Sequence, residues 1–134
     1  MGTEHAKANS FKLATNYVLV ILLELMGQVY SLAEKSGLDL QLMNHLIDII
    51  FDYPGLKQYS KRIKNLDFDT VGFDLSTAFK DLMLILETST QVRSPLPFAN
   101  IVHDKYLAAL ANNLEKKDWI ATYKITRMLA GLQS

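Results

Sequence analysis

The chain has 134 residues, of which 49% are hydrophobic and 21% charged, the composition of a single globular domain spanning residues 1–134. Fourteen basic and fourteen acidic residues cancel, so no net charge attracts nucleic acid or an anionic membrane surface. The absence of cysteine excludes disulfides, thiolate metal sites and a cysteine nucleophile, and it fits a cytoplasmic protein. We therefore expect neither nucleic acid nor a membrane as a partner.

The first predicted element is a long helix from about Lys7 to Lys35 that is apolar on almost every face. Such a helix is typically buried on several sides, so we expect it to be long and central. Its most apolar run, Tyr17 to Met26, is about half as long as a membrane span and contains Glu24, which indicates a core helix. Gly37 suits the left-handed position that follows a helix end.

Shorter helices follow in the rest of the chain. Asp39 is placed to cap a helix that ends near Phe51, and Pro54-Gly55 then breaks the chain. Pro97 suits a first helical position, and Asp118 suits a cap. With no strand pattern between them, apolar spacing predicts further helices over about 56–64, 75–92, 97–113 and 118–131. The predicted fold class is all-α, a multi-helix domain built around one long central helix.

Familiar motifs for phosphate or metal binding are absent from the sequence. The six glycines never fall two residues apart, which excludes both the dinucleotide fingerprint and the phosphate-binding P-loop. His5, His45 and His103 are isolated and lack the paired spacing of a helical metal site. We therefore expect surface or structural roles for the histidines and no metal.

Two polar pairs stand out within apolar helical segments. Lys12 and Asn16 are four residues apart, so an ammonium and an amide share one face of the long helix and can bind the same ligand. Lys80 and Asp81 are charged neighbours inside the apolar helix predicted over 75–92. For both pairs a solvent-facing position without function is the alternative, and spacing alone does not exclude it.

Several short motifs occur in a characteristic order: Lys12-Leu13-Ala14-Thr15-Asn16, Leu32-Ala33-Glu34-Lys35-Ser36-Gly37-Leu38-Asp39, Asp67-Phe68-Asp69 through Phe73, Phe79-Lys80-Asp81-Leu82, Ser94-Pro95-Leu96-Pro97 and Lys117-Asp118-Trp119. This order resembles the C-terminal domain of the β-hydroxyacid dehydrogenase family, typified by 3-hydroxyisobutyrate dehydrogenase. The related domain of 6-phosphogluconate dehydrogenases is similar in fold. The resemblance covers nearly the whole chain.

The resemblance implies a reaction, the reversible transfer of hydride between a small 3-hydroxy acid and NAD or NADP. It makes Lys12 the catalytic lysine that exchanges the hydroxyl proton, and it makes Asn16 a substrate-binding residue. Lys80 would bind the cofactor from this side of the cleft. Asp81 is assigned only an orienting role. Family members also pair through this domain, so a homodimer is expected.

The sequence departs from the family pattern at three points. Ala6-Lys7-Ala8-Asn9-Ser10 replaces a glycine-containing segment before the lysine, Thr15-Asn16 replaces the commoner Asn-Asn, and Ile120 replaces Ser or Ala. These differences leave the identity of the hydroxy acid open.

The N-terminal Rossmann domain of the family, which carries the dinucleotide fingerprint, is expected to be absent from this chain. We therefore expect a piece of a longer enzyme, produced by truncation or proteolysis, that is inactive and binds no cofactor by itself. The residues that choose between NAD and NADP would lie in the absent domain. The alternative is a free-standing helical protein-interaction domain without catalysis.

Overall fold

The computed structural model describes residues 2–133, apart from the side chains at positions 17 and 20. Within that range the chain forms helices and turns, and its only extended pairing is an isolated bridge between Asp74 and Asp118. The elements are α1 (Gly2–Lys35), α2 (Leu40–Phe51), α3 (Gly55–Lys64), α4 (Leu75–Val92), α5 (Pro97–Ala111), the 3-10 turn η1 (Trp119–Ala121) and α6 (Thr122–Leu129). The all-α prediction is confirmed.

Side-chain caps and a proline determine where several helices begin. Asp39 accepts a hydrogen bond from the Gln41 N–H at 2.9 Å before α2, and Asp74 accepts one from the Thr77 N–H at 2.7 Å before α4. Pro97 is the first residue of α5, where its missing N–H costs no helical hydrogen bond. The predicted roles of Asp39 and Pro97 are confirmed.

The last predicted helix is divided in two. Asp118 caps η1 rather than a continuous helix, accepting the Ile120 N–H at 3.1 Å, and α6 begins only at Thr122. Its carboxylate also accepts hydrogen bonds from a distant loop, described below.

Left-handed residues close several of the helices. Gly37 has a φ of 71° after α1, as predicted. Three residues that carry side chains have the same left-handed backbone just after α3, α4 and α5. Their φ values are 56° for Leu66, 57° for Arg93 and 60° for Asn113. This conformation is strained for residues other than glycine, so the packing that follows each of these turns must offset the strain.

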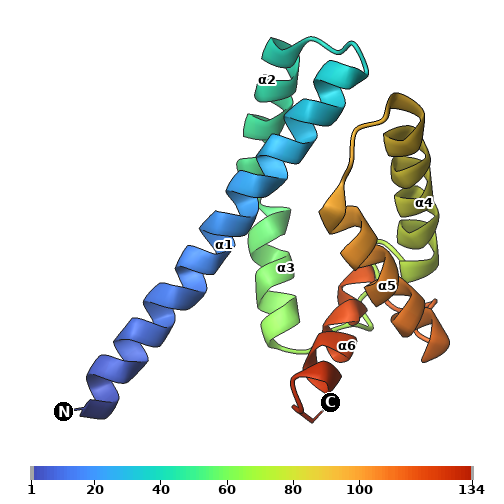
Figure 1. Cartoon of the computed structure of the whole chain (residues 1–134). Helices are drawn as coiled ribbons and strands as arrows, with labels where there is room; N and C mark the ends of the chain where they lie inside the picture. Colours follow the sequence, from blue (N-terminus) through green and yellow to red (C-terminus); the bar gives the residue numbers. More distant parts are fainter. Residues whose placement is uncertain (1, 134) are drawn as a thin grey trace.

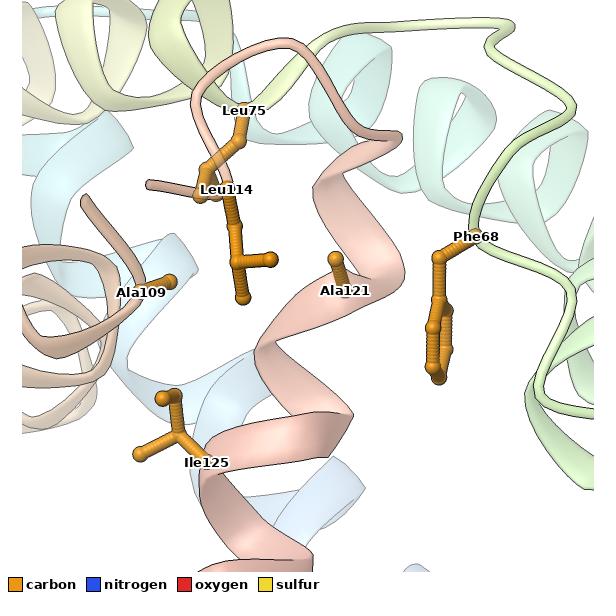
Figure 2. Packing of buried hydrophobic residues seen from close by; sticks show 6 residues of the cluster. All are labelled: Phe68, Leu75, Ala109, Leu114, Ala121 and Ile125. Carbon is orange, nitrogen blue, oxygen red and sulfur yellow. The ribbon is translucent and has the colours of Figure 1, made fainter. Parts of the chain in front are cut away.

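The hydrophobic core lies in the second half of the chain. Helices α4, α5 and α6 and the turn η1 pack together there, with the loop that follows α3 against them. Figure 2 shows six buried side chains from these segments converging: Phe68, Leu75, Ala109, Leu114, Ala121 and Ile125. This core holds the start of α4, where the predicted cofactor residue is found.

Helix α1 is long, as predicted, but the expectation that it is central and buried is wrong within the single chain. It packs against α2 and α4 through its second half, while its first half projects away from the other helices (Figure 1). The side chains of Phe11 and Leu23 are 75% and 65% exposed, and among the described side chains of α1 those of Gln28 and Ala33 are buried. A helix of 34 residues is about 50 Å long at about 1.5 Å per residue. The other helices of the described range are much shorter, so they cover only part of its length.

Helix α1 is also the one helix of the described range that is long and apolar enough to cross a membrane by length and composition. Its most apolar 18-residue window has a mean hydropathy of 1.4, and 6% of that window is buried. Core helices of water-soluble proteins and signal sequences meet the same criteria. Apolar faces of this size indicate burial against something other than this chain.

Candidate functional site

The first predicted pair, Lys12 and Asn16, lies on the projecting half of α1, and both side chains are exposed. The hydroxyl of Thr15, which stands between them, donates to the backbone carbonyls of Phe11 and Lys12 at 3.0 Å each. It is therefore turned back onto its own helix and is not offered to a ligand. The ammonium of Lys12 and the amide of Asn16 remain available on this face.

The second predicted pair, Lys80 and Asp81, lies on α4 beside the core. Both side chains are exposed, whereas Ala78 and Leu82 on the same helix are buried. In the range 2–133, neither Lys80 nor Lys12 lies within ion-pair distance of a carboxylate. Each ammonium is thus free to meet an anionic or polar group from outside the chain.

The chain does not bring the two pairs together. Where α1 meets α4 and α5, the contact is made by residues that follow Lys12 by several turns, around an apolar cavity of about 340 Å³ lined by Leu25, Gln28, Val29, Leu32, Leu82, Ile85, Leu96, Phe98, Ala99 and Val102. The distance along the α1 axis from Lys12 to Leu25 is about 20 Å, at about 1.5 Å per residue. In a single copy of this chain, Lys12 thus lies several helical turns from the contact of α1 with α4 and α5.

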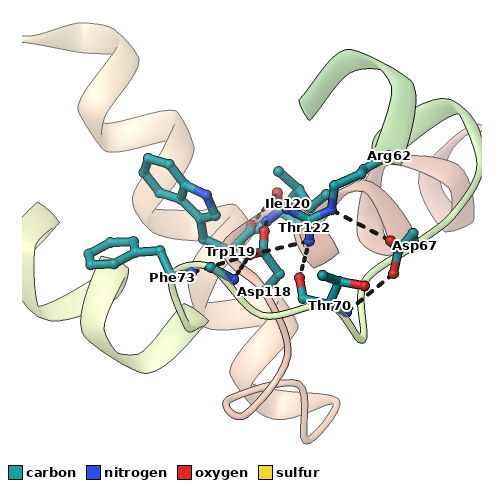
Figure 3. A network of polar contacts seen from close by, with 9 residues as sticks. Arg62, Asp67, Thr70, Phe73, Asp118, Trp119, Ile120 and Thr122 are labelled. Atoms are coloured by element: carbon teal, nitrogen blue, oxygen red, sulfur yellow. Dashed lines mark hydrogen bonds and ion pairs between the residues drawn. The ribbon is translucent and has the colours of Figure 1, made fainter. Parts of the chain in front are cut away.

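A buried ion pair that the sequence did not reveal fixes the loop before α4. The carboxylate of Asp118 is fully buried, and its Oδ2 accepts the N–H groups of Gly72 and Phe73 at 3.0 and 3.3 Å. The Nη2 of Arg62 lies 3.4 Å from the same oxygen (Figure 3). From the sequence, Asp118 was predicted to be a cap and part of the Lys117-Asp118-Trp119 motif. No local pattern links it to an arginine on α3.

The same arginine reaches the other end of the loop. Its Nη2 also donates to the Thr70 carbonyl, and its Nε lies 3.6 Å from Oδ2 of Asp67. The Thr70 N–H donates to Asp67, and this hydrogen bond holds the pKa of Asp67 below its ordinary value. Arg62 thus ties α3, the loop and η1 into one unit.

Aromatic side chains pack over this network. The Trp119 ring meets the edges of Phe73 and Tyr59, with centroids 5.0 and 5.8 Å apart and interplanar angles of 79° and 72°. Such edge-to-face pairs contribute about 0.5–1.5 kcal/mol each beyond the area they bury. Loop, α3 and η1 therefore form a rigid support under the first turns of α4, which carries Lys80.

Across the described residues, no three His, Asp or Glu side chains gather in a way that would hold a metal ion. The polar groups of the site are lysines, an amide and the structural carboxylates described above.

A family model described as the NAD-binding of NADP-dependent 3-hydroxyisobutyrate dehydrogenase matches residues 6–126. The chain belongs to this family. The match includes Lys12, Asn16, Lys80 and Asp81, so membership of the dehydrogenase family inferred from the order of the motifs is confirmed.

A curated relative and two solved structures are similar to the chain. An uncharacterized oxidoreductase, YfjR of Bacillus subtilis (strain 168), is 27% identical over 124 residues, which are 92% of this chain and 43% of the relative. An imine reductase from Pseudomonas sp. superposes with a TM-score of 0.65 at 18% identity, over 87% of this chain and 40% of that one. An imine reductase from Myxococcus stipitatus in complex with NADP+ gives a TM-score of 0.70 at 12% identity, over 84% and 43%.

The likeness to the two imine reductases shows the fold alone. The chain spans less than half the length of the curated relative and of both solved structures. The match to these relatives therefore covers only part of each of them.

Proposed function

We propose that this chain is the helical C-terminal domain of an NAD(P)-dependent β-hydroxyacid dehydrogenase. The whole enzyme would transfer hydride reversibly between a small 3-hydroxy acid and the nicotinamide cofactor. The observation that carries the proposal is the family match over residues 6–126, a range that includes the exposed residues Lys12 and Asn16. The fraction of each relative that the chain spans, 40–43%, agrees with one domain of a two-domain enzyme.

In this proposal Lys12 exchanges the proton of the substrate hydroxyl. An ammonium enclosed in a dry cleft gives up its proton more readily than one in water, because burial disfavours the charged form. The exposed face of α1 becomes such a cleft when a second domain closes over it. Asn16, one turn further on, would then hold the substrate by a hydrogen bond from its amide.

The cofactor, when bound, supplies the hydride chemistry. This chain can contact only part of the cofactor. Lys80 offers one exposed cation with no carboxylate partner in the described range. The sequence has no glycine-rich loop to hold a pyrophosphate. Asp81, exposed on the same helix, would have an orienting role. The remaining contacts would come from an N-terminal Rossmann domain.

We also propose a homodimer that buries the apolar faces of α1. In a twofold dimer each copy covers the same surface of the other, so one long helix can supply both halves of the interface. The charge balance and the absence of cysteine support a cytoplasmic enzyme with no nucleic-acid or membrane partner.

The proposal is tested on the parent protein and on the present chain by itself. The parent protein should oxidise at least one small 3-hydroxy acid when a panel is assayed with NAD and with NADP, and its upstream sequence should contain a strand followed by Gly-x-Gly-x-x-Gly. The present chain alone should show no turnover and no dinucleotide binding at micromolar concentration by calorimetry, because it supplies one wall of the cleft. Micromolar binding to this chain, or a native protein that begins at Met1, would favour the alternative of a free-standing interaction domain.

A further inference from the structure

A cavity of about 310 Å³ opens between α6 and the loop that follows α3, and we call it the α6 cavity. It is lined by Leu66, Phe68, Asp69, Lys117, Lys124 and Arg127. None of the residues proposed for dehydrogenation lines it. Its volume is at the lower end of the range for small-molecule sites, roughly 300–1,000 Å³.

The lining of the α6 cavity carries an excess of positive charge. Lys117 forms an ion pair with Asp69, so these two charges offset each other. Lys124 and Arg127 have no carboxylate within ion-pair distance anywhere in residues 2–133. Among the described residues, two cations without a carboxylate partner therefore lie at one concave site.

Aromatic rings hold these two cations in place without neutralising them. The Nζ of Lys124 lies 5.7 Å from the centroid of the Phe68 ring, and the guanidinium of Arg127 lies 5.6 Å from that of Tyr123. The Nε and Nη2 of Arg127 also donate to the Gln133 carbonyl at 2.9 and 2.5 Å, and its Nη1 donates to the Tyr123 hydroxyl at 3.5 Å. These partners in the described range are all neutral. Both side chains are partly buried, and each cation lies over an aromatic ring.

The rim of the cavity includes a strained residue. Leu66 has a φ of 56°, in a region that residues with a branched side chain rarely adopt. It lies two residues after the end of α3, and the N–H of the next residue, Asp67, donates to the Arg62 carbonyl at 2.9 Å. The arginine that binds Asp118 thus also fixes the direction in which Leu66 and Phe68 enter the cavity.

We propose that the α6 cavity binds a phosphate group, with Lys124 and Arg127 as the two cations that meet its charge. A phosphate dianion matches two positive charges, and the N–H groups of Lys124 and Arg127 that have no acceptor in the described range can donate charge-assisted hydrogen bonds to phosphate oxygens. Leu66 and Phe68 give the cavity an apolar wall on which the organic part of a phosphate ester can rest. The site is distinct from the proposed catalytic face, so it goes beyond the proposed dehydrogenase function.

The test is a titration of this chain, followed by amide chemical shifts in NMR, with inorganic phosphate, phenyl phosphate and benzoate in parallel. Saturable shifts are expected for the two phosphates at residues 66–69 and 117–127, and benzoate, with one charge and a similar ring, should bind more weakly. Tighter binding of phenyl phosphate than of inorganic phosphate identifies a phosphate ester as the ligand, and equal binding identifies free phosphate. Absence of saturable shifts up to about 50 mM phosphate would overturn the proposal.

Three variants and one control show whether Lys124 and Arg127 are responsible for phosphate binding. Lys124→Gln and Arg127→Gln should each weaken phosphate binding by about tenfold, the effect of losing one hydrogen bond to a charged group. Lys124→Arg keeps the charge and should retain binding. Lys116→Gln is the matched control, because Lys116 is exposed beside Lys117 and does not line the cavity. An equal loss in Lys116→Gln and Lys124→Gln, with dispersed spectra for both, would show non-specific attraction and overturn the site.

Discussion

The guanidinium of Arg62 lies 3.4 Å from the carboxylate of Asp118, which has no solvent exposure at all. One residue is on α3 and the other just before η1, and between them they fix the loop that leads into α4. Because three backbone N–H groups also donate to this carboxylate, it is the most heavily used acceptor described for the chain. Removal of this carboxylate should therefore destabilise the fold by more than the loss of one ion pair.

Asp118→Ala should lower the free energy of unfolding by about 3–5 kcal/mol, because it leaves a partly buried cation and three N–H groups without their acceptor. Urea denaturation followed by circular dichroism measures the change. The matched control is Asp69→Ala, whose ion pair with Lys117 is formed by an 82% exposed side chain and should contribute no more than about 1 kcal/mol. Similar losses in both variants would show that the buried pair has no special role.

Arg93→Gly should stabilise the chain by about 1 kcal/mol. Arg93 ends α4 with a φ of 57°, and glycine adopts that conformation without the strain that a side chain imposes. Arg93→Ala is the control, since it removes the exposed side chain but keeps the strain, and it should leave stability nearly unchanged. A higher thermal midpoint for the alanine variant than for the glycine variant would contradict this explanation.

The free energy of unfolding should fall in acid, because the carboxyl group of Asp74 becomes protonated. Hydrogen bonds from Thr77 and Ser76 hold the pKa of Asp74 below its ordinary value of 3.8. A carboxyl whose pKa is lower in the folded state stabilises that state above pH 3.8, and the contribution is lost as the pH falls through the lowered pKa. Urea midpoints measured from pH 6 to pH 2 should therefore drop less for Asp74→Asn, which keeps a capping oxygen but cannot titrate.

Lys12 should govern turnover in the full-length parent enzyme. Lys12→Ala should lower kcat by about 10²–10⁴-fold with little effect on cofactor binding, the usual contribution of a positioned acid or base. Lys12→Arg should fail almost as badly, because arginine stays protonated and cannot exchange the proton. Retention of more than about a tenth of kcat by Lys12→Arg, less than about 1.4 kcal/mol in the barrier, would remove Lys12 from the proton-transfer step.

Lys80→Ala supplies the contrast in the same enzyme. Loss of a ground-state contact to the cofactor should raise the KM for the dinucleotide and leave kcat much less affected. An unchanged KM would leave Lys80 as an ordinary exposed residue of α4.

The chain should associate into a dimer through α1. Light scattering at about micromolar to millimolar concentration should show twice the mass of one chain, and Leu23→Glu should shift it toward the monomer by placing a charge on an apolar face. Leu129→Glu is the control, since Leu129 is 75% exposed on α6 and Leu23 is 65% exposed on α1. A strictly monomeric mass over the whole range would refute the dimer.

Much of the secondary structure could be predicted from the sequence because caps, prolines and left-handed closures act on neighbouring residues. Asp39, Gly37 and Pro97 act where local chemistry places them. The order of short motifs also indicated the family, because a helical domain of this type carries its polar residues at characteristic places along the chain. These features depend on residues that are close together in the sequence, so they can be predicted without knowing how the helices pack.

The partners of each helix were decided only by the tertiary structure. The apolar pattern of α1 predicts burial, but whether the covering surface comes from the same chain depends on where α4 and α5 lie. The Arg62–Asp118 pair and the α6 cavity join residues far apart in sequence, and no spacing rule relates them. Hydrophobic burial and ion pairing depend on distance in space, so they become visible only when the chain path is known.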